Sequence, residues 1–268
     1  MEEHNKTKST ENNSNRIKRN ITVNDMDLSE CGKYQELNGS WVIWMLISGI
    51  ILCFKNLYGG IALIIISAII FFLYKRSPGN ISATYFNLAL NCINKDDMEK
   101  SKEYLFEAVK IDPKNKVAYV LLSSIYYKEG NYKDTIDNIL KSNVLKAENS
   151  KYNYLVGACY FNINDYENCI KYLNSVKYED NNGMKYVRDV LLAKAYCLNE
   201  DYKQALKIFN RVVNASDEFK GNILEFNYFL GLTYLRLGEN DKANRELKKV
   251  YTEDKEYRDI ENLIKEIN

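Results

Sequence analysis

Side chains that could carry out chemistry are few and scattered in this sequence. The one histidine is His4, in a polar stretch far from any helical pattern. A catalytic triad, a histidine general base or a histidine metal site is therefore not expected in a folded region. The six cysteines contain no C-x-x-C pair, so we interpret them as reduced structural thiols of a cytosolic domain. They are Cys31, Cys53, Cys92, Cys159, Cys169 and Cys197.

Adjacent carboxylates could serve as an acid–base pair, but each pair falls in a predicted turn. Asp96-Asp97, Glu179-Asp180 and Asp217-Glu218 are expected to cap helices or face water. No glycine-rich phosphate loop is present. The sequence therefore predicts no catalytic residue, no metal and no cofactor, and we do not expect an enzyme.

The charges almost cancel, with 37 Lys and Arg against 36 Asp and Glu. A nucleic-acid partner normally requires a strongly basic domain, so none is expected.

Three regions follow one another along the chain. Residues 1–40 are polar and are predicted to be a disordered cytosolic tail, not a signal peptide. Residues 41–76 form an apolar transmembrane region, interrupted by Lys55-Asn56 and Gly59-Gly60. One straight helix would place Lys55 in lipid at a cost of a few kcal/mol. Two short helices, at about 41–54 and 57–74, avoid that cost; a single span at 57–74 with a re-entrant first segment is the alternative.

The positive charges predict the orientation of this region. Lys75 and Arg76 follow the second helix, and Arg16, Lys18 and Arg19 precede the first. Positive residues stay on the cytoplasmic side, so both ends and the C-terminal region are expected in the cytoplasm. The chain would be an integral membrane protein that contacts the bilayer through residues 41–74.

An internal repeat is the strongest signal in the sequence. A small residue recurs at spacings of 34, 34, 36 and 38 residues, with an aromatic three positions later in four of the five copies. The small residues are Ala89, Ser123, Gly157, Ala193 and Gly231. Turn pairs separate two predicted helices in each copy: Asp96-Asp97, Gly130-Asn131, Asn164-Asp165, Glu200-Asp201 and Gly238-Glu239. The pattern is typical of antiparallel helix pairs that stack, because the small residue lets the second helix approach.

The segment SATYFNLALNCINKDDMEKSKEYLFEAVKIDPKNK, with Ala108 and Pro113, resembles a tetratricopeptide repeat (TPR). The resemblance implies an all-α solenoid of about five units, at residues 82–115, 116–149, 150–183, 186–219 and 224–257. Within the repeat region, residues 82–257, Cys92 replaces the usual aromatic of the first unit, and Asn240 departs from the pattern in the fifth. Residues 256–268 are expected to form the C-terminal capping helix.

By the same resemblance, a peptide or helix would bind on the concave face, which the first helix of each unit lines. The positions expected there are Phe86, Leu90, Val120, Tyr127, Tyr154, Phe161, Lys194 and Tyr228. This face is apolar and aromatic, so we expect an apolar or amphipathic partner segment. The alternatives are that these side chains pack inside the superhelix, or that the tail or a second copy of the chain fills the groove. Of the family's carboxylate-clamp positions only Lys151 fits, so a receptor for chaperone tails is not expected.

Two functions follow from these expectations. The first is a membrane-tethered scaffold or adaptor that concentrates its protein partner at the membrane. The second is an assembly or chaperone-like factor for membrane proteins, in which the transmembrane hairpin itself makes helix–helix contacts.

Overall fold

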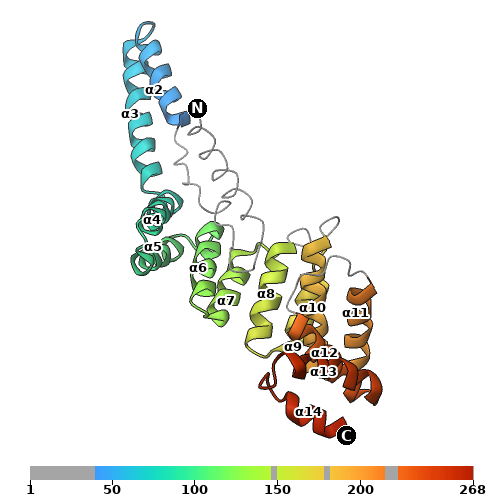
Figure 1. Cartoon of the computed structure of the whole chain (residues 1–268). Coiled ribbons are helices and arrows are strands. Elements are labelled where there is room, and N and C mark those ends of the chain that lie inside the picture. The colour runs from blue at the N-terminus through green and yellow to red at the C-terminus, as the bar shows by residue number, and fades with distance from the viewer. Residues whose placement is uncertain (1–39, 146–149, 178–181, 215–222, 268) are drawn as a thin grey trace, which may run out of the picture. The chain divides into compact units, whose positions relative to one another are not determined.

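The computed structural model describes residues 40–145, 150–177, 182–214 and 223–267 (Figure 1). The tail predicted to be disordered therefore lies outside the described residues, apart from its last residue. His4, Cys31 and the acidic pairs at 179–180 and 217–218 lie outside them too. The described residues contain thirteen helices and no strand, which confirms the all-α prediction. The chain divides into two compact units, Met1–Asn131 and Tyr132–Asn268.

The first unit begins with a hairpin of two apolar helices, α2 (Ser40–Cys53) and α3 (Leu57–Lys75), which pack side by side (Figure 1). The ring of Trp41, at the start of α2, lies 5.9 Å from that of Tyr74, at the end of α3, so the two helices are antiparallel. Asn56 caps α3 by accepting a hydrogen bond from the Gly59 amide at 3.1 Å. These bounds compare with the helices at about 41–54 and 57–74 expected from the sequence.

Glycines set the distance between α2 and α3. A Cβ on Gly60 would lie 2.4 Å from the backbone nitrogen of Cys53, and one on Gly49 would lie 2.8 Å from Ile64 Cγ1. Gly59 and Gly60, which were expected to interrupt the apolar run, both lie inside α3. Gly60 permits the close contact with α2, because a Cβ there would overlap Cys53, whereas a Cβ on Gly59 would meet only the side chain of Asn56.

Among the described residues, α3 alone has the length and the apolar composition to cross a membrane; α2 is apolar but shorter. Most large side chains of this hairpin point away from its helix–helix contact. Those exposed are Trp41, Ile43, Trp44, Ile47, Ile50, Ile51, Leu52, Phe54, Leu57, Tyr58, Ile61, Ile65, Ile66, Ile69, Phe71, Phe72 and Leu73.

The rest of the first unit contains α4 (Pro78–Ile93), α5 (Met98–Ile111) and α6 (Lys116–Lys128). Helix α4 begins four residues before the predicted start of the first repeat at 82. The fixed φ of Pro78 matches that of a helix, so proline favours the first turn. A buried polar network ties the three helices together. Ser82 Oγ donates to the Ala108 carbonyl at 2.7 Å and accepts from Asn115 Nδ2 at 2.8 Å.

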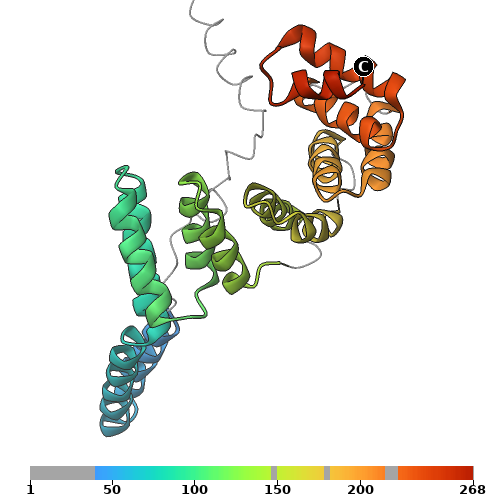
Figure 2. The same ribbon diagram turned by 90° about the horizontal axis from the view of Figure 1, so that it is seen from below.

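The second unit contains the consecutive helices α7 to α14, and Figure 2 shows α8 and α9, α10 and α11, and α12 and α13 as three packed pairs. The helices of this unit are α7 (Tyr132–Ser142), α8 (Ser150–Asn162), α9 (Tyr166–Asn174), α10 (Asn182–Leu198), α11 (Tyr202–Asn214), α12 (Ile223–Arg236), α13 (Asn240–Glu253) and α14 (Ile260–Ile267). Helix α10 begins four residues before the predicted unit at 186. Helix α14 packs on α12 and α13 and begins four residues after the predicted start at 256, because residues 254–259 form a turn.

The five predicted turns share one backbone geometry. The first residue of each turn pair has a positive φ: Asp96, Gly130, Asn164, Glu200 and Gly238. The amide of the second residue donates to the carbonyl five positions back, as in Asp97 to Cys92 and Glu239 to Tyr234, both at 2.9 Å. This pattern is the Schellman ending of a helix, and it reverses the chain sharply enough to form a hairpin.

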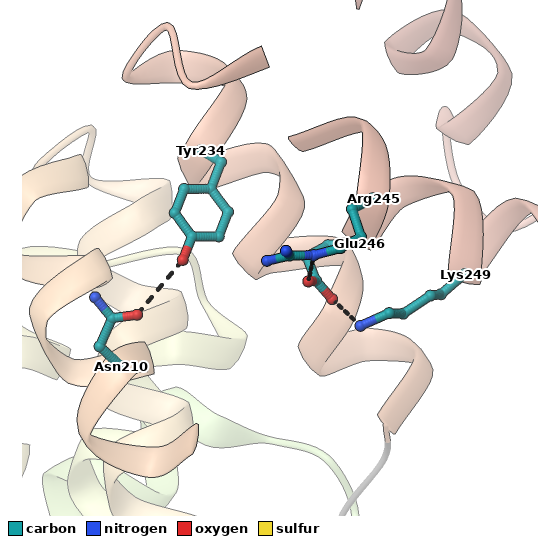
Figure 3. Close-up of polar contacts among 5 residues, drawn as sticks. All are labelled: Asn210, Tyr234, Arg245, Glu246 and Lys249. Carbon is teal, nitrogen blue, oxygen red and sulfur yellow. Dashed lines mark hydrogen bonds and ion pairs between the residues drawn. The ribbon is translucent and has the colours of Figure 1, made fainter. Parts of the chain in front are cut away.

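Three of the repeat tyrosines contact the second helix of the preceding pair. Tyr234 donates to Asn210 Oδ1 at 3.5 Å (Figure 3), and Tyr196 accepts from Asn174 Nδ2 at 3.2 Å. In the first unit, the ring of Tyr126 lies edge-on to Phe106 at 6.5 Å. The recurring aromatic therefore contacts the neighbouring helix pair as well as packing within its own pair.

Candidate functional site

The predicted face residues of the first unit are mostly buried. Phe86 and Leu90 lie in the core that α4, α5 and α6 share, with Leu105 and Leu121. Val120 is also buried, while Tyr127 is partly exposed on α6. Phe86 and Leu90 therefore fit the alternative that these side chains pack inside the superhelix better than they fit partner binding.

In the second unit, helices α8, α10 and α12 bring two of the predicted residues together. Lys194 on α10 places its Nζ 4.9 Å from the ring centroid of Phe161 on α8. The same ammonium lies 5.4 Å from the ring of Phe229 on α12. Phe161 is partly exposed, and Tyr154, farther back on α8, is buried. A cation between two aromatic faces is an attractive arrangement because each ring presents its negative face.

A carboxylate on α12 completes this group. Lys194 Nζ lies 2.8 Å from Glu225 Oε1, with 10% of the lysine side chain and 25% of the glutamate side chain exposed. The buried charge of Lys194 is thus paired, as a buried charge must be. We call Phe161, Lys194, Glu225 and Phe229 the aromatic–charged row.

Tyr228 lies beside the row and is covered by the turn before α14. Its ring packs against Phe229 at 5.3 Å and Tyr257 at 5.6 Å, and its hydroxyl donates to Asp259 Oδ1. Burial, followed by the hydrogen bond to Asp259, raises the pKa of Tyr228 well above its ordinary value of about 10. The hydroxyl is therefore a neutral donor at physiological pH.

The sequence reading did not single out Glu225, Phe229 or Arg258. Glu225 lies three residues before Tyr228 and so shares its face of α12, which offered a weak signal for Glu225. Phe229 directly follows Tyr228, so helical spacing gave no such signal for it. Arg258 carried no signal, because its position depends on how the final turn folds back onto α12.

Cys159 and Cys169, two of the described cysteines, are buried. Burial raises the pKa of the Cys159 thiol to about 12 and that of the Cys169 thiol to about 12, so both are neutral at physiological pH. Within the ranges that the structure describes, no three side chains of the metal-binding types lie close enough to hold an ion.

Comparison with protein-family models gives two matches. Residues 95–176 match the model of subunit 3 of the anaphase-promoting complex, or cyclosome, and residues 224–257 match a tetratricopeptide-repeat model. No sequence among the curated proteins matches the chain.

Two solved structures show the same fold at low sequence identity. YrrB, described as a TPR protein with an unusual peptide-binding site, is 17% identical with a TM-score of 0.53, over 68% of this chain and 90% of YrrB. MamA is 20% identical with a TM-score of 0.52, over 67% of this chain and 97% of MamA. The tetratricopeptide-repeat model covers α12 and α13, and the two solved structures share the fold of this chain.

Proposed function

We propose that this chain is a scaffold or adaptor that a helical hairpin tethers to a membrane and whose repeats bind a protein segment. The tether rests on α3, which is long and apolar enough to span a bilayer. Helix α2 packs along it, and both helices expose isoleucine, phenylalanine and tryptophan side chains whose burial in lipid is favourable. The hairpin would insert as a unit, with the Lys55 turn at the far surface.

The repeats would face the cytoplasm. Lys75 Nζ lies 5.0 Å from the ring of Phe71, and the Arg76 guanidinium lies 4.2 Å from the ring of Phe72. Aromatic and basic side chains at the end of an apolar helix are typical of the membrane–water interface. In vesicles of both orientations, protease should cleave the repeats only where the cytoplasmic face is outside. Cleavage from the opposite face would contradict this topology.

The aromatic–charged row is the observation that carries the binding proposal. It combines ring faces with a paired cation and carboxylate on three successive first helices, α8, α10 and α12. Aromatic anchors are typical of the residues that dominate binding energy in protein interfaces. YrrB, which has the same fold, is described as having a peptide-binding site, and this supports a peptide or helix as the partner.

The binding proposal is tested by crosslinking and affinity capture of the full-length protein from its native membrane. Phe161→Ala should reduce capture of the partner at least about fivefold, since an interface aromatic contributes 1 kcal/mol or more. Phe106→Ala is the matched control, because this phenylalanine is 46% exposed on α5, a helix that contributes no residue to the row. Equal capture by the two folded variants would contradict the row as the binding site, and capture of a second copy of the chain alone would make the partner the protein itself.

A second function is favoured by the close contact of α2 and α3 at Gly49 and Gly60. A hairpin packed this tightly presents a defined surface, as an assembly or chaperone-like factor for membrane proteins would need. Replacing residues 41–74 with an unrelated two-span anchor should preserve a scaffold and disable an assembly factor. The readout is partner capture by the replaced chain.

A further inference from the structure

The turn between α13 and α14 places Arg258 against the aromatic–charged row. Its guanidinium lies 5.0 Å from the ring of Phe229, 5.3 Å from that of Tyr228 and 5.6 Å from that of Tyr257. One guanidinium nitrogen, Nη2, lies 3.3 Å from Glu225 Oε1. Arg258 therefore sits in a site made of aromatic rings and one carboxylate.

Glu225 forms ion pairs with two cations, which differ in burial and in distance from the carboxylate. Lys194 is 10% exposed and lies 2.8 Å from the same oxygen, whereas the Arg258 side chain is 46% exposed and lies farther away. Lys194 therefore belongs to the helix packing. Arg258 occupies the outer position of the carboxylate, where another cation could replace it at little cost to the core.

The backbone at Arg258 adds to this difference. Its φ is +50°, a left-handed conformation that is strained for a residue with a Cβ. The following helix is anchored independently, because Ile260 and Leu263 are buried. The contacts at Arg258 and Asp259 could therefore open while α14 stays in place.

We infer that Glu225, Tyr228 and Phe229 form a binding site for an arginine or lysine side chain of a partner segment, and that Arg258 fills this site as an internal ligand. The inference rests on the proposed function and specifies the partner's chemistry. Planar guanidinium groups stack on aromatic faces and pair with carboxylates, which is the environment that these three residues offer. An acidic side chain at this position is disfavoured, because Glu225 would repel it.

The test uses the full-length chain in lipid nanodiscs, with Arg258→Ala and Asp259→Ala combined to free the site. The probe is a fluorescent peptide of residues 254–261, DKEYRDIE, and its binding is followed by anisotropy. A second probe carries alanine in place of the arginine. Lys255→Ala is the matched control chain, because Lys255 lies in the same turn but over Tyr251.

The freed chain should bind the arginine probe at least about tenfold more tightly than the unmodified and Lys255→Ala chains do. The alanine probe should bind about tenfold more weakly, as expected for loss of a partly desolvated cation–π contact and its ion pair. Adding Glu225→Gln to the freed chain should shrink the difference between the probes.

Equal binding of both probes, or no binding to a freed chain that circular dichroism shows to be folded, would overturn the inference. The single variant Arg258→Ala provides a second host if the double variant does not fold. If the peptide test fails but Phe161→Ala still lowers partner capture, the scaffold proposal stands. If Phe161→Ala has no effect either, the proposed binding site fails as well.

Discussion

Gly231 on α12 lies so close to Leu247 on α13 that a Cβ on the glycine would come within 2.6 Å of Leu247 Cγ. The same contact recurs two repeats earlier in the chain, where a Cβ on Gly157 would lie 2.7 Å from Leu173 Cδ2. Each pair is separated by 16 residues in the sequence. The small residue of the repeat is therefore the point at which the two helices of a pair come closest.

Gly231→Ala should destabilise the protein by about 1–2 kcal/mol. The added methyl group overpacks the contact with Leu247, which outweighs the higher helix propensity of alanine. The free energy of unfolding from denaturant titration measures this. Gly79→Ala is the control, because a Cβ there meets only Asp112 Oδ2 at 3.7 Å; equal stability of the two variants would contradict the close contact.

Asp189→Asn should lower the free energy of unfolding by about 3 kcal/mol. The carboxylate is 2% exposed and lies 2.7 Å from Arg188 Nε and 3.0 Å from Arg211 Nη2, so the change leaves two cations without their counter-charge. Arg188 also donates to the carbonyls of Leu173 and Val176, which ties α10 to the end of α9.

The control for this prediction is an exposed pair. Asp137→Asn removes the partner of Lys141, and both side chains are 54% exposed. Such pairs contribute roughly 0–1 kcal/mol because water screens them. A loss at Asp189 no larger than that at Asp137 would show that the buried pair does not stabilise α10.

Lys194→Ala should destabilise the chain by about 2 kcal/mol, because Glu225 loses its closest cation and two rings lose their shared ammonium. Thermal and denaturant unfolding followed by circular dichroism would measure the change. Lys171→Ala is the matched change, since Lys171 is exposed and lies 5.9 Å from a single ring, that of Tyr172. Similar losses for both lysines would mean that Lys194 acts only through its alkyl chain.

Cys159 and Cys169 should resist alkylation in the folded protein at pH 8. Burial raises the pKa of each thiol from 9.0 to about 12, so the nucleophilic thiolate is scarce. The stabilisation from burying a neutral thiol is complete below the unfolded pKa and is lost as the pH rises through about 12.

Iodoacetamide labelling with peptide mass spectrometry measures this reactivity. Cys92, which is partly exposed, should label first, and the two buried thiols should label only when the protein unfolds. Labelling of Cys159 as fast as Cys92 without unfolding would contradict the packing of α8.

Much of the local structure could be predicted because short-range rules determine it. The break near Asn56, the five turns and the order of the helices follow from residues that cap, end or favour a helix. Helix starts at Pro78, Asn182 and Ile260 differ from the predicted starts by four residues each, since the end of a helix depends on the first turn and on neighbours rather than on periodicity.

The candidate site was only partly predictable. The resemblance to the tetratricopeptide repeat placed Phe161, Lys194 and Tyr228 on the first helices of their units, and the structure brings all three into contact with residues of the aromatic–charged row. The resemblance also placed Phe86 and Leu90 on the binding face, although both lie in the core of the first unit. A repeat pattern gives the position of a residue on a helix but not the depth at which neighbouring helices bury it.

The sequence by itself therefore determined the all-α class, the helix pairs, the turns and the apolar hairpin, because these depend on contacts between residues close in the chain. Only the tertiary structure decided which face residues remain accessible, and that Glu225 pairs with both Lys194 and Arg258. Those pairings join α10, α12 and the final turn, segments separated by about thirty residues. No local rule relates side chains so far apart, since their meeting depends on how the helices pack.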